Sequence, residues 1–159
     1  VTTAGDDVDV LVAMNPAALI TNLKDLIPGG LIVVDTDAFT DKNMTRAGYT
    51  SNPIEDGSLD AYRVMPIDIT KQVLESVKPY GLTHKFAVRC KNMWTLGLVM
   101  WLFDRDRTAT IDSLKAKFKT KPEIADANIA ALNAGHAYGE TAELPTGVVV
   151  YEVRRAQVV

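Results

Sequence analysis

The sequence predicts an α/β fold built on a mainly parallel sheet with helices on both faces. Residues 8–14 and 31–34 are nearly continuous apolar runs, as in strands that are buried on both faces. Between them lies a segment with helical spacing of its apolar residues. Because a strand–helix–strand unit of about 30 residues connects parallel strands by a right-handed crossover, these observations together predict a parallel sheet covered by helices.

The composition is that of a globular protein and argues against several classes. Of the residues, 47% are hydrophobic and 23% charged, and 17 Lys and Arg against 20 Asp and Glu disfavour a nucleic-acid partner. The longest nearly uncharged stretch, residues 92–103, is far shorter than the roughly 20 residues that span a bilayer, and residues 1–7 lack the cationic start of a signal peptide. Cys90 is the only cysteine, which excludes an internal disulfide and fits a cytoplasmic location.

The length of 159 residues suits one domain with a full core. We expect this domain over residues 1–147, with residues 148–159 as a trailing strand or the start of a linker to a next domain. The chain begins at Val1, a few residues before a core-type strand. Such an abrupt start is typical of a fragment of a longer polypeptide, and removal of an initiator Met would give the same start.

The first helix is expected to start at Asn15 and Pro16 and to stop at Pro28-Gly29-Gly30. Asn15 suits the N-cap, and Pro16 suits the first helical position because its missing N–H would be unpaired there anyway. Glycine after a proline is a common helix stop. Leu19, Leu23 and Leu26 are expected on one face of this helix, with Ile20 and Ile27 beside them.

The segment after the second strand is expected to be rich in loops. Residues 38–58 contain many Gly, Asn, Asp, Ser and Thr residues, with one short helix expected over Asp41–Ala47. A third strand follows over Tyr62–Ile67. Thr70 is expected to cap the next helix, whose Val73, Leu74 and Val77 face inward and which ends at Pro79-Tyr-Gly81.

The remaining chain is predicted to be mainly helical. The longest helix is expected over His84–Phe103, and because it is apolar nearly all round from Met93 onward it is typical of a buried helix. Two amphipathic helices are expected over Thr110–Lys119 and Pro122–Tyr138. A last strand is expected over Val148–Val153.

Asn15 stands where open parallel sheets hold their ligands, outside the carboxyl end of a strand and at the start of a helix. An N-cap role alone would also explain an asparagine at this position, and we favour that interpretation. Asp35, at the end of the second strand, invites comparison with the ribose-binding carboxylate of dinucleotide-binding folds. No G-x-G-x-x-G turn precedes it between Val8 and Asn15, so a complete nicotinamide site is disfavoured.

The other residues with catalytic or metal-binding chemistry favour structural roles. His84 and His136 lie far apart in the sequence, show no metal-ligand spacing and are interpreted as partly exposed helical histidines. Cys90 has no base signalled nearby and is interpreted as a small core residue. We therefore expect neither a metal centre nor a cysteine nucleophile.

Gly97 interrupts an otherwise apolar helical stretch. Glycine at such a position costs about 1 kcal/mol relative to alanine, so we predict that another backbone packs closely against it. Trp94 and Trp101 lie seven residues apart, on one helical face. Such a pair belongs to a core or, less often, to an interface.

Four segments, taken in order, resemble a known family: "DVLVAMNPAALITNLKDLIPGGLIVVD", "VMPIDITKQ", "KNMWTLGLVMWL" and "KPEIADANIAALNAGHAYGE". Over roughly residues 6–143 they resemble the gamma domain of the 2-oxoacid:ferredoxin oxidoreductases. The resemblance is to the gamma domain fused at the front of the large subunit of 2-oxoglutarate:ferredoxin oxidoreductase in particular. No single segment is specific for the family, whereas the order and spacing of the four segments together are.

The resemblance implies a Rossmann-like, non-catalytic module of a larger enzyme. That enzyme converts a 2-oxoacid and coenzyme A into an acyl-CoA and carbon dioxide and passes two electrons to ferredoxin. Thiamine diphosphate, magnesium and iron–sulfur clusters are implied for the complete enzyme and none of them for this chain. The gamma domain is implied to contribute to subunit packing and to coenzyme A binding, and Asn15 and Asn92 are the crevice-lining positions that match the family.

One departure from the family pattern concerns the coenzyme A site. The family domain opens with a strand and a G-x-G-G-Q-G loop, and no such loop occurs in this sequence. The fold is therefore expected to lack its first strand and its Gly-rich loop, and the implied coenzyme A site to be incomplete.

A second interpretation belongs to a different class of protein, a stand-alone degenerate nucleotide-binding module without enzymatic activity. Under the first interpretation the isolated chain is inactive, and its partners are the other domains or subunits of the oxidoreductase and, through the complex, ferredoxin. Part of the Trp94 and Trp101 face would then be exposed in a fragment, which would favour self-association.

Overall fold

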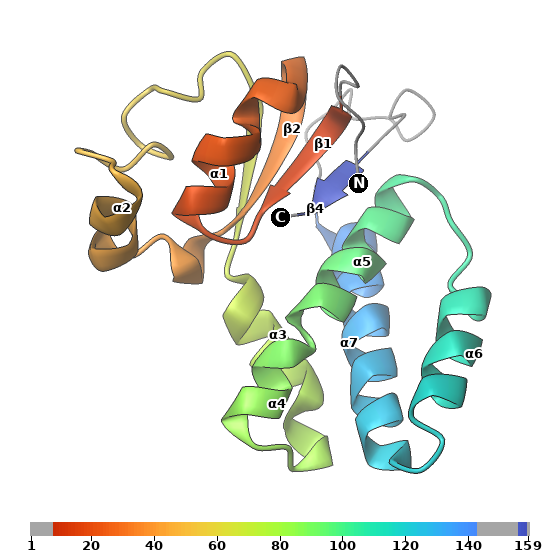
Figure 1. The fold of residues 1–159 in the computed structure, drawn as a ribbon. Coiled ribbons are helices and arrows are strands. Elements are labelled where there is room, and N and C mark those ends of the chain that lie inside the picture. Colours follow the sequence, from red (N-terminus) through yellow and green to blue (C-terminus); the bar gives the residue numbers. More distant parts are fainter. Residues whose placement is uncertain (1–7, 143–155, 159) are drawn as a thin grey trace. The chain divides into compact units, whose positions relative to one another are not determined.

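The computed structural model describes residues 8–142 and 156–158 and divides the chain into two compact units (Figure 1). The first, called here the sheet unit, comprises residues 1–68 and 151–159, and the second, the helical unit, comprises residues 69–150. The expected domain boundary at residue 147 and the strand expected over Val148–Val153 lie outside the described residues. Both therefore stay predictions.

The sheet unit contains a parallel sheet with strand order β3-β2-β1-β4. The strands are β1 (Val8–Ala13), β2 (Leu26–Asp35), β3 (Arg63–Ile67) and β4 (Ala156–Val158). β1 pairs in parallel with β2 and with β4, and β2 pairs in parallel with β3. Val10, Leu11, Val12 and Ala13 of β1 are fully buried, as the apolar run predicted. The parallel, Rossmann-like α/β fold is thereby confirmed.

The first helix is shorter than the sequence predicted. α1 (Pro16–Asn22) is followed by a single 3₁₀ turn, η1 (Leu23–Asp25), so the prediction that the helix runs on to Pro28 was wrong. Near its end the Asn22 side-chain amide donates to the Ala18 carbonyl at 2.9 Å. The error arose at Leu26, which continues the helical spacing but is the buried first residue of β2.

The Pro28-Gly29-Gly30 segment lies inside β2 instead of ending a helix. Val8 pairs with Leu26 whereas Val10 pairs with Leu31, so β2 carries extra residues between two points of one register. Gly29 has a φ of 77°, which favours glycine. Proline has no N–H to donate to the ladder, and these three residues together form an irregularity in the strand. A Pro-Gly-Gly sequence is compatible both with a helix stop and with such an irregularity, so the sequence alone did not distinguish them.

The sheet unit buries one core between the strands and two helices. α2 (Asp41–Ala47) forms as predicted, because the Thr40 hydroxyl accepts from the Asn43 N–H at 3.2 Å and Gly48 ends it in the left-handed conformation. η2 (Thr36–Ala38) precedes it. The buried members of this core are Leu11, Ala13, Leu19, Leu26, Ile32, Val34, Phe39, Met44 and Leu59.

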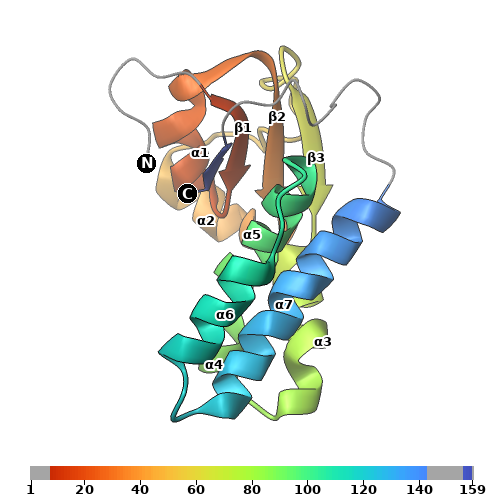
Figure 2. The same cartoon turned by 90° about the vertical axis from the view of Figure 1, so that its right-hand side faces the viewer.

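The helical unit comprises five α-helices among the residues that the structure describes, joined by short turns (Figure 2). They are α3 (Ile69–Val77), α4 (His84–Arg89), α5 (Lys91–Leu102), α6 (Thr108–Lys117) and α7 (Pro122–Thr141), with the 3₁₀ turn η3 (Lys78–Tyr80) after α3. Thr70, expected as a cap, is instead the second residue of α3. Val73 and Val77 are buried and Leu74 is half-buried, and Gly81 ends the segment with a φ of 62°.

The predicted single helix over His84–Phe103 is two helices that meet at Cys90. Cys90 has φ −70° and ψ −7°, and its N–H donates to the Ala87 carbonyl at 3.1 Å, three residues back. This bond spans three residues, as in a 3₁₀ turn, where an α-helical bond spans four. It ends α4, and α5 starts at the next residue. No proline or glycine marks the break, so the spacing of apolar residues gave no sign of it. α7, with 20 residues, is the longest described helix.

α5 and α7 pack backbone against backbone through glycines. A Cβ atom at Gly97 would lie 1.9 Å from the Leu132 carbonyl oxygen, and one at Gly135 would lie 1.8 Å from the Trp94 carbonyl oxygen. The predicted close approach at Gly97 is therefore confirmed. The two helices touch because neither carries a side chain at these points.

The two tryptophans differ in their surroundings. Trp94 is 1% exposed, and its ring centroid lies 5.3 Å from that of Tyr138 at an interplanar angle of 57°. Trp101 is half-buried and packs over Gly139. Trp94 thus belongs to the core, and of the two tryptophans only Trp101 is partly exposed. The expected self-association of a fragment through part of this face stays a prediction.

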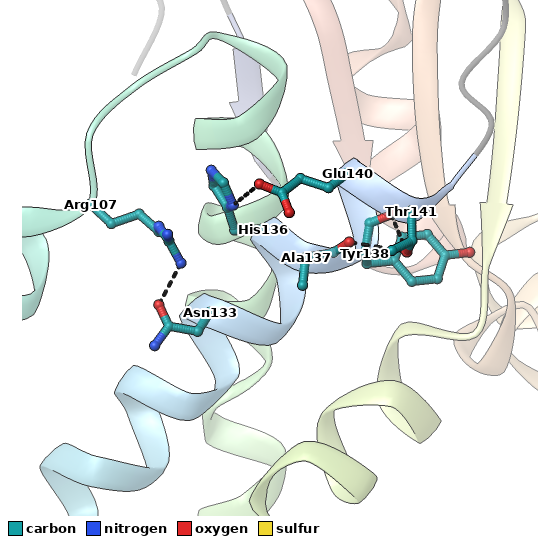
Figure 3. A network of polar contacts seen from close by, with 7 residues as sticks. All are labelled: Arg107, Asn133, His136, Ala137, Tyr138, Glu140 and Thr141. Atoms are coloured by element: carbon teal, nitrogen blue, oxygen red, sulfur yellow. Dashed lines mark hydrogen bonds and ion pairs between the residues drawn. The ribbon is translucent and has the colours of Figure 1, made fainter.

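Polar contacts join α7 to the segment before α6 and join residues one turn apart within α7 (Figure 3). The Arg107 guanidinium donates to the Asn133 side-chain oxygen at 2.7 Å and so fixes the segment before α6 to α7. His136 Nδ1 lies 3.6 Å from a Glu140 carboxylate oxygen one turn later. His84 is exposed at the start of α4. Both histidines are helical and at least partly exposed, as predicted. Among the described helices, none is long and apolar enough to cross a membrane.

Candidate functional site

A crevice of about 390 Å³ lies where β1 gives way to α1, and we call it the Asn15 crevice. Its lining residues are Asn15, Pro16, Ala17, Asn43, Arg46 and Ala47. They come from the start of α1 and from α2, both in the sheet unit. In the sheet, β1 lies between β2 and β4. The chain adds β2 and β3 on one side of β1 and β4 on the other, so the strand order reverses beside β1. Parallel sheets commonly bind ligands at such a point.

Asn15 begins α1 and has the geometry of an N-cap. Its backbone is extended, with φ −161° and ψ 167°, and its side-chain oxygen accepts from the Ala18 N–H at 2.8 Å. The predicted N-cap role is confirmed. Among the described residues its side-chain nitrogen has no hydrogen-bond partner and is exposed, so it is available to a bound group.

Arg46 supplies the charge of the Asn15 crevice. It lies in the last turn of α2, is exposed, and has no ion pair with any described residue. Asn43 donates from its side-chain nitrogen to the Ala38 carbonyl at 2.9 Å, which fixes its side chain. No carboxylate lines the crevice. A guanidinium beside amide groups suits a phosphate or carboxylate.

Asp35, the carboxylate considered for a ribose, is placed elsewhere. It is fully buried, and its side-chain oxygen accepts from the Asp37 N–H at 3.2 Å as the cap of η2. It does not line the Asn15 crevice. Arg46, which does line the crevice, was not predicted from the sequence. Its one local signal is its position on the helix that follows the second strand of the βαβ unit.

Asn92, the second predicted site residue, lies in the helical unit. It stands in the first turn of α5 and lines a groove of about 590 Å³. This α4–α7 groove is formed by residues of α4, the start of α5, the end of α6 and the start of α7. The two predicted asparagines thus lie in different units, and neither cavity includes both. Their roles as cofactor contacts stay predictions.

Cys90 is buried at the junction of α4 and α5. It is 2% exposed, and its thiol donates to the Phe86 carbonyl at 3.6 Å. Burial raises the pKa of the Cys90 thiol, so less of the reactive thiolate is present at a given pH. The expected small core residue is confirmed.

We predict that Cys90 resists alkylation in the folded protein. Near neutral pH, iodoacetamide should modify it at least about tenfold more slowly than it modifies the same peptide in guanidinium, because both burial and the raised pKa lower access to thiolate. Mass spectrometry of the peptide that contains Cys90 measures the rate. Equal rates in the folded and unfolded states would contradict the prediction.

The described residues contain no group of three or more His, Cys, Asp or Glu side chains that could hold a metal ion. The two cavities instead present positive charge, from the Arg46 guanidinium in the Asn15 crevice and from Arg89, Lys117 and Lys121 in the α4–α7 groove.

Comparison with known proteins agrees with the fold and with the resemblance. Residues 1–138 match the family described as pyruvate ferredoxin/flavodoxin oxidoreductase. Over 141 residues the chain is 48% identical to 2-oxoglutarate oxidoreductase subunit KorA of Mycobacterium tuberculosis, an alignment that covers 89% of this chain and 22% of KorA. The chain thus spans about a fifth of the length of this curated relative.

Two solved structures share the fold. The first is 2-oxoglutarate:ferredoxin oxidoreductase from Magnetococcus marinus with 2-oxoglutarate, coenzyme A and succinyl-CoA bound, with a TM-score of 0.64 and 24% identity over 93% of this chain and 22% of that chain. The second is the gamma subunit of a keto/oxoacid ferredoxin oxidoreductase from Geobacter sulfurreducens, with a TM-score of 0.54 and 17% identity over 84% of this chain and 65% of that one. With its sequence match and its fold in agreement, the chain belongs to the pyruvate ferredoxin/flavodoxin oxidoreductase family.

Proposed function

We propose that this chain is the gamma domain of a 2-oxoacid:ferredoxin oxidoreductase that uses 2-oxoglutarate or a related 2-oxoacid. The 48% identity to a 2-oxoglutarate oxidoreductase subunit supports the substrate class. We propose further that the domain packs against the other domains or subunits of that enzyme, that ferredoxin is reached through the complex, and that the complex is cytoplasmic. Family membership argues against a stand-alone nucleotide-binding module.

The proposed role of the domain is to help bind coenzyme A. The single observation that carries it is the Asn15 crevice, which presents the Arg46 guanidinium and no carboxylate at the end of the parallel strand β1. Coenzyme A carries phosphate groups, which a guanidinium binds with two parallel hydrogen bonds. The free side-chain nitrogen of Asn15 would donate a further hydrogen bond to the same group.

The carbon chemistry belongs to other parts of the proposed enzyme. Thiamine diphosphate with magnesium, when bound there, stabilises the carbanion that decarboxylation leaves. This chain has a single cysteine, which cannot supply the four thiolates of an iron–sulfur cluster. The proposed role of its own residues is to bind and orient: Arg46 and Asn15 hold an anionic group at the carboxyl end of β1. Asn92, in the helical unit, stays a prediction as a second coenzyme A contact.

We predict that Arg46→Gln in the complete oxidoreductase raises the KM for coenzyme A about tenfold, because a hydrogen bond to a charged group is lost. The KM for 2-oxoglutarate should stay unchanged, since under this proposal Arg46 contacts coenzyme A and not the 2-oxoacid. The assay is 2-oxoglutarate-dependent reduction of a viologen dye at varied coenzyme A.

Two further variants separate binding from folding. Lys42→Gln removes one exposed positive charge from the same helix but outside the crevice, and should leave the KM for coenzyme A unchanged. Asn15→Asp keeps an equally good N-cap and places a negative charge in the crevice, so it should raise that KM without loss of stability. An unchanged KM in both Arg46→Gln and Asn15→Asp would refute the coenzyme A role, and a complex inactive with every 2-oxoacid would refute the proposed function.

A further inference from the structure

The α4–α7 groove combines an apolar floor with positive charge. Its apolar lining residues are Leu82, Phe86, Met93, Leu114, Phe118 and Ile124. Its charged lining residues are Arg89, Lys117 and Lys121, and no Asp or Glu side chain lines it. Glu123 and Asp126 stand on the same part of α7, but they do not line the groove. The groove therefore offers apolar contact and cations together.

Two of the three cations lie over aromatic rings of the same groove. The Arg89 guanidinium carbon is 5.2 Å from the centroid of the Phe86 ring, and the Lys117 Nζ is 5.4 Å from the centroid of the Phe118 ring. These contacts hold the positive groups beside the apolar surface. Within the described part of the chain, no carboxylate forms an ion pair with any of the three cations.

The net charge of the whole helical unit also favours an anionic ligand. Residues 69–150 contain eleven Lys and Arg against eight Asp and Glu, whereas the rest of the chain contains six against twelve. Four lysines alternate along residues 115–121, and two of them, Lys117 and Lys121, line the groove. An anion is thus attracted to the helical unit although the chain as a whole is negative.

The break at Cys90 contributes to this shape. Phe86 and Arg89 precede it on α4, whereas Asn92 and Met93 follow it on α5, and all four line the groove. Phe86 is 40% exposed, so part of its ring is accessible to a bound group although the Arg89 guanidinium lies over it. At about 590 Å³ the groove has the size of small-molecule sites.

We propose that the α4–α7 groove binds a small amphipathic organic anion, an alkyl or aryl chain that carries one carboxylate or phosphate group. The chain lies along Phe86, Met93 and Phe118, and Lys117 and Lys121 hold the anionic end. This inference goes beyond the proposed function, because it concerns a cavity of the helical unit and needs neither Asn15 nor Arg46.

The test is a calorimetric titration of the intact protein with decanoate, decyl phosphate and 1-decanol, all below their aggregation concentrations. Both anions are expected to bind, and the neutral alcohol at least about tenfold more weakly, because it lacks a charge for the lysines. Shortening the carboxylate by one methylene should weaken binding about threefold to fourfold if the chain is buried in the groove. No binding of either anion would overturn the proposal.

Paired lysine variants test the location. Lys117→Gln with Lys121→Gln should weaken decanoate binding about tenfold and leave 1-decanol unaffected. Lys115→Gln with Lys119→Gln removes the same charge from the same run of residues, outside the groove lining, and should change decanoate binding less than about twofold. Equal losses in the two double variants would indicate general attraction to a basic surface and would overturn the proposed site.

Competition with coenzyme A separates this inference from the proposed function. Asn92 lines the same groove, so this inference is an alternative to the predicted contact of Asn92 with coenzyme A. Under the inference, decanoate affinity should be the same with and without saturating coenzyme A. Displacement of decanoate by coenzyme A would overturn the proposal that the groove binds a separate ligand. It would assign the groove, with Asn92, to coenzyme A. The Arg46→Gln result bears on the Asn15 crevice only, so either proposal can fail without the other.

Discussion

Replacing Gly97 with alanine is expected to destabilise the helical unit by about 3 kcal/mol or more, the upper end of overpacking effects. The added Cβ would lie 1.9 Å from the Leu132 carbonyl oxygen, closer than any real contact, and the atom that it meets is backbone. A backbone carbonyl cannot rotate away as a side chain does, so α5 and α7 must separate. The gain in helix propensity, about 1 kcal/mol, is too small to offset this cost.

Hydrogen exchange of α5 and α7 peptides in the intact protein measures this loss locally. Gly135→Ala should behave like Gly97→Ala, because its Cβ would meet the Trp94 carbonyl oxygen at 1.8 Å. Ala137→Ser is the control, since it adds one atom at an exposed position of α7 and should leave protection unchanged. If Gly97→Ala cost less than about 1 kcal/mol, the close packing of the two helices would be refuted.

Replacing Trp94 with alanine is expected to cost about 3–5 kcal/mol, the range for a large aromatic side chain removed from a core. Trp94 is 1% exposed and packs against the Tyr138 ring, so its removal leaves a cavity between α5 and α7. The surrounding helices can close this cavity only in part, because their backbones are already in contact at the two glycines.

Trp101→Ala is the matched comparison, because Trp101 lies on the same helix and is only half-buried. Trp101→Ala should lower the free energy of unfolding by less than about half as much as Trp94→Ala, because folding buries less of the Trp101 side chain. Urea unfolding followed by far-UV circular dichroism measures both. Equal losses would show that burial in the folded chain does not distinguish the two tryptophans.

Features that depend on neighbouring residues could be predicted from the sequence. The first strand, the cap at Asn15, the short helix α2 and the close contact at Gly97 each have a local signal: an apolar run, a capping residue, a Thr–Gly pair at the ends, or a glycine inside an apolar helix. The start of β2 and the break at Cys90 could not be predicted. At Leu26 a strand residue continues a helical spacing, and at Cys90 a helix ends without a proline or glycine.

The candidate site shows the same limit. Asn15 was found because a strand end followed by a helix start is visible in the sequence. Arg46 was missed because it reaches the crevice from a second helix, through tertiary packing that no local pattern encodes. The groove beside Asn92 was missed for the same reason, since its lining comes from four helices and depends on the break between two of them.

The pairing of β1 with β4 bears on the order in which the chain folds. Val10 pairs with Ala156, so β1 meets β4 only after the whole helical unit has left the ribosome. Closing so long a loop costs entropy and slows the pairing, whereas helical hairpins such as α6 and α7 form from local contacts. During synthesis, therefore, the β4 side of β1 stays without its β4 partner until residues 156–158 arrive, and an unpaired strand edge can pair with other strands in that interval.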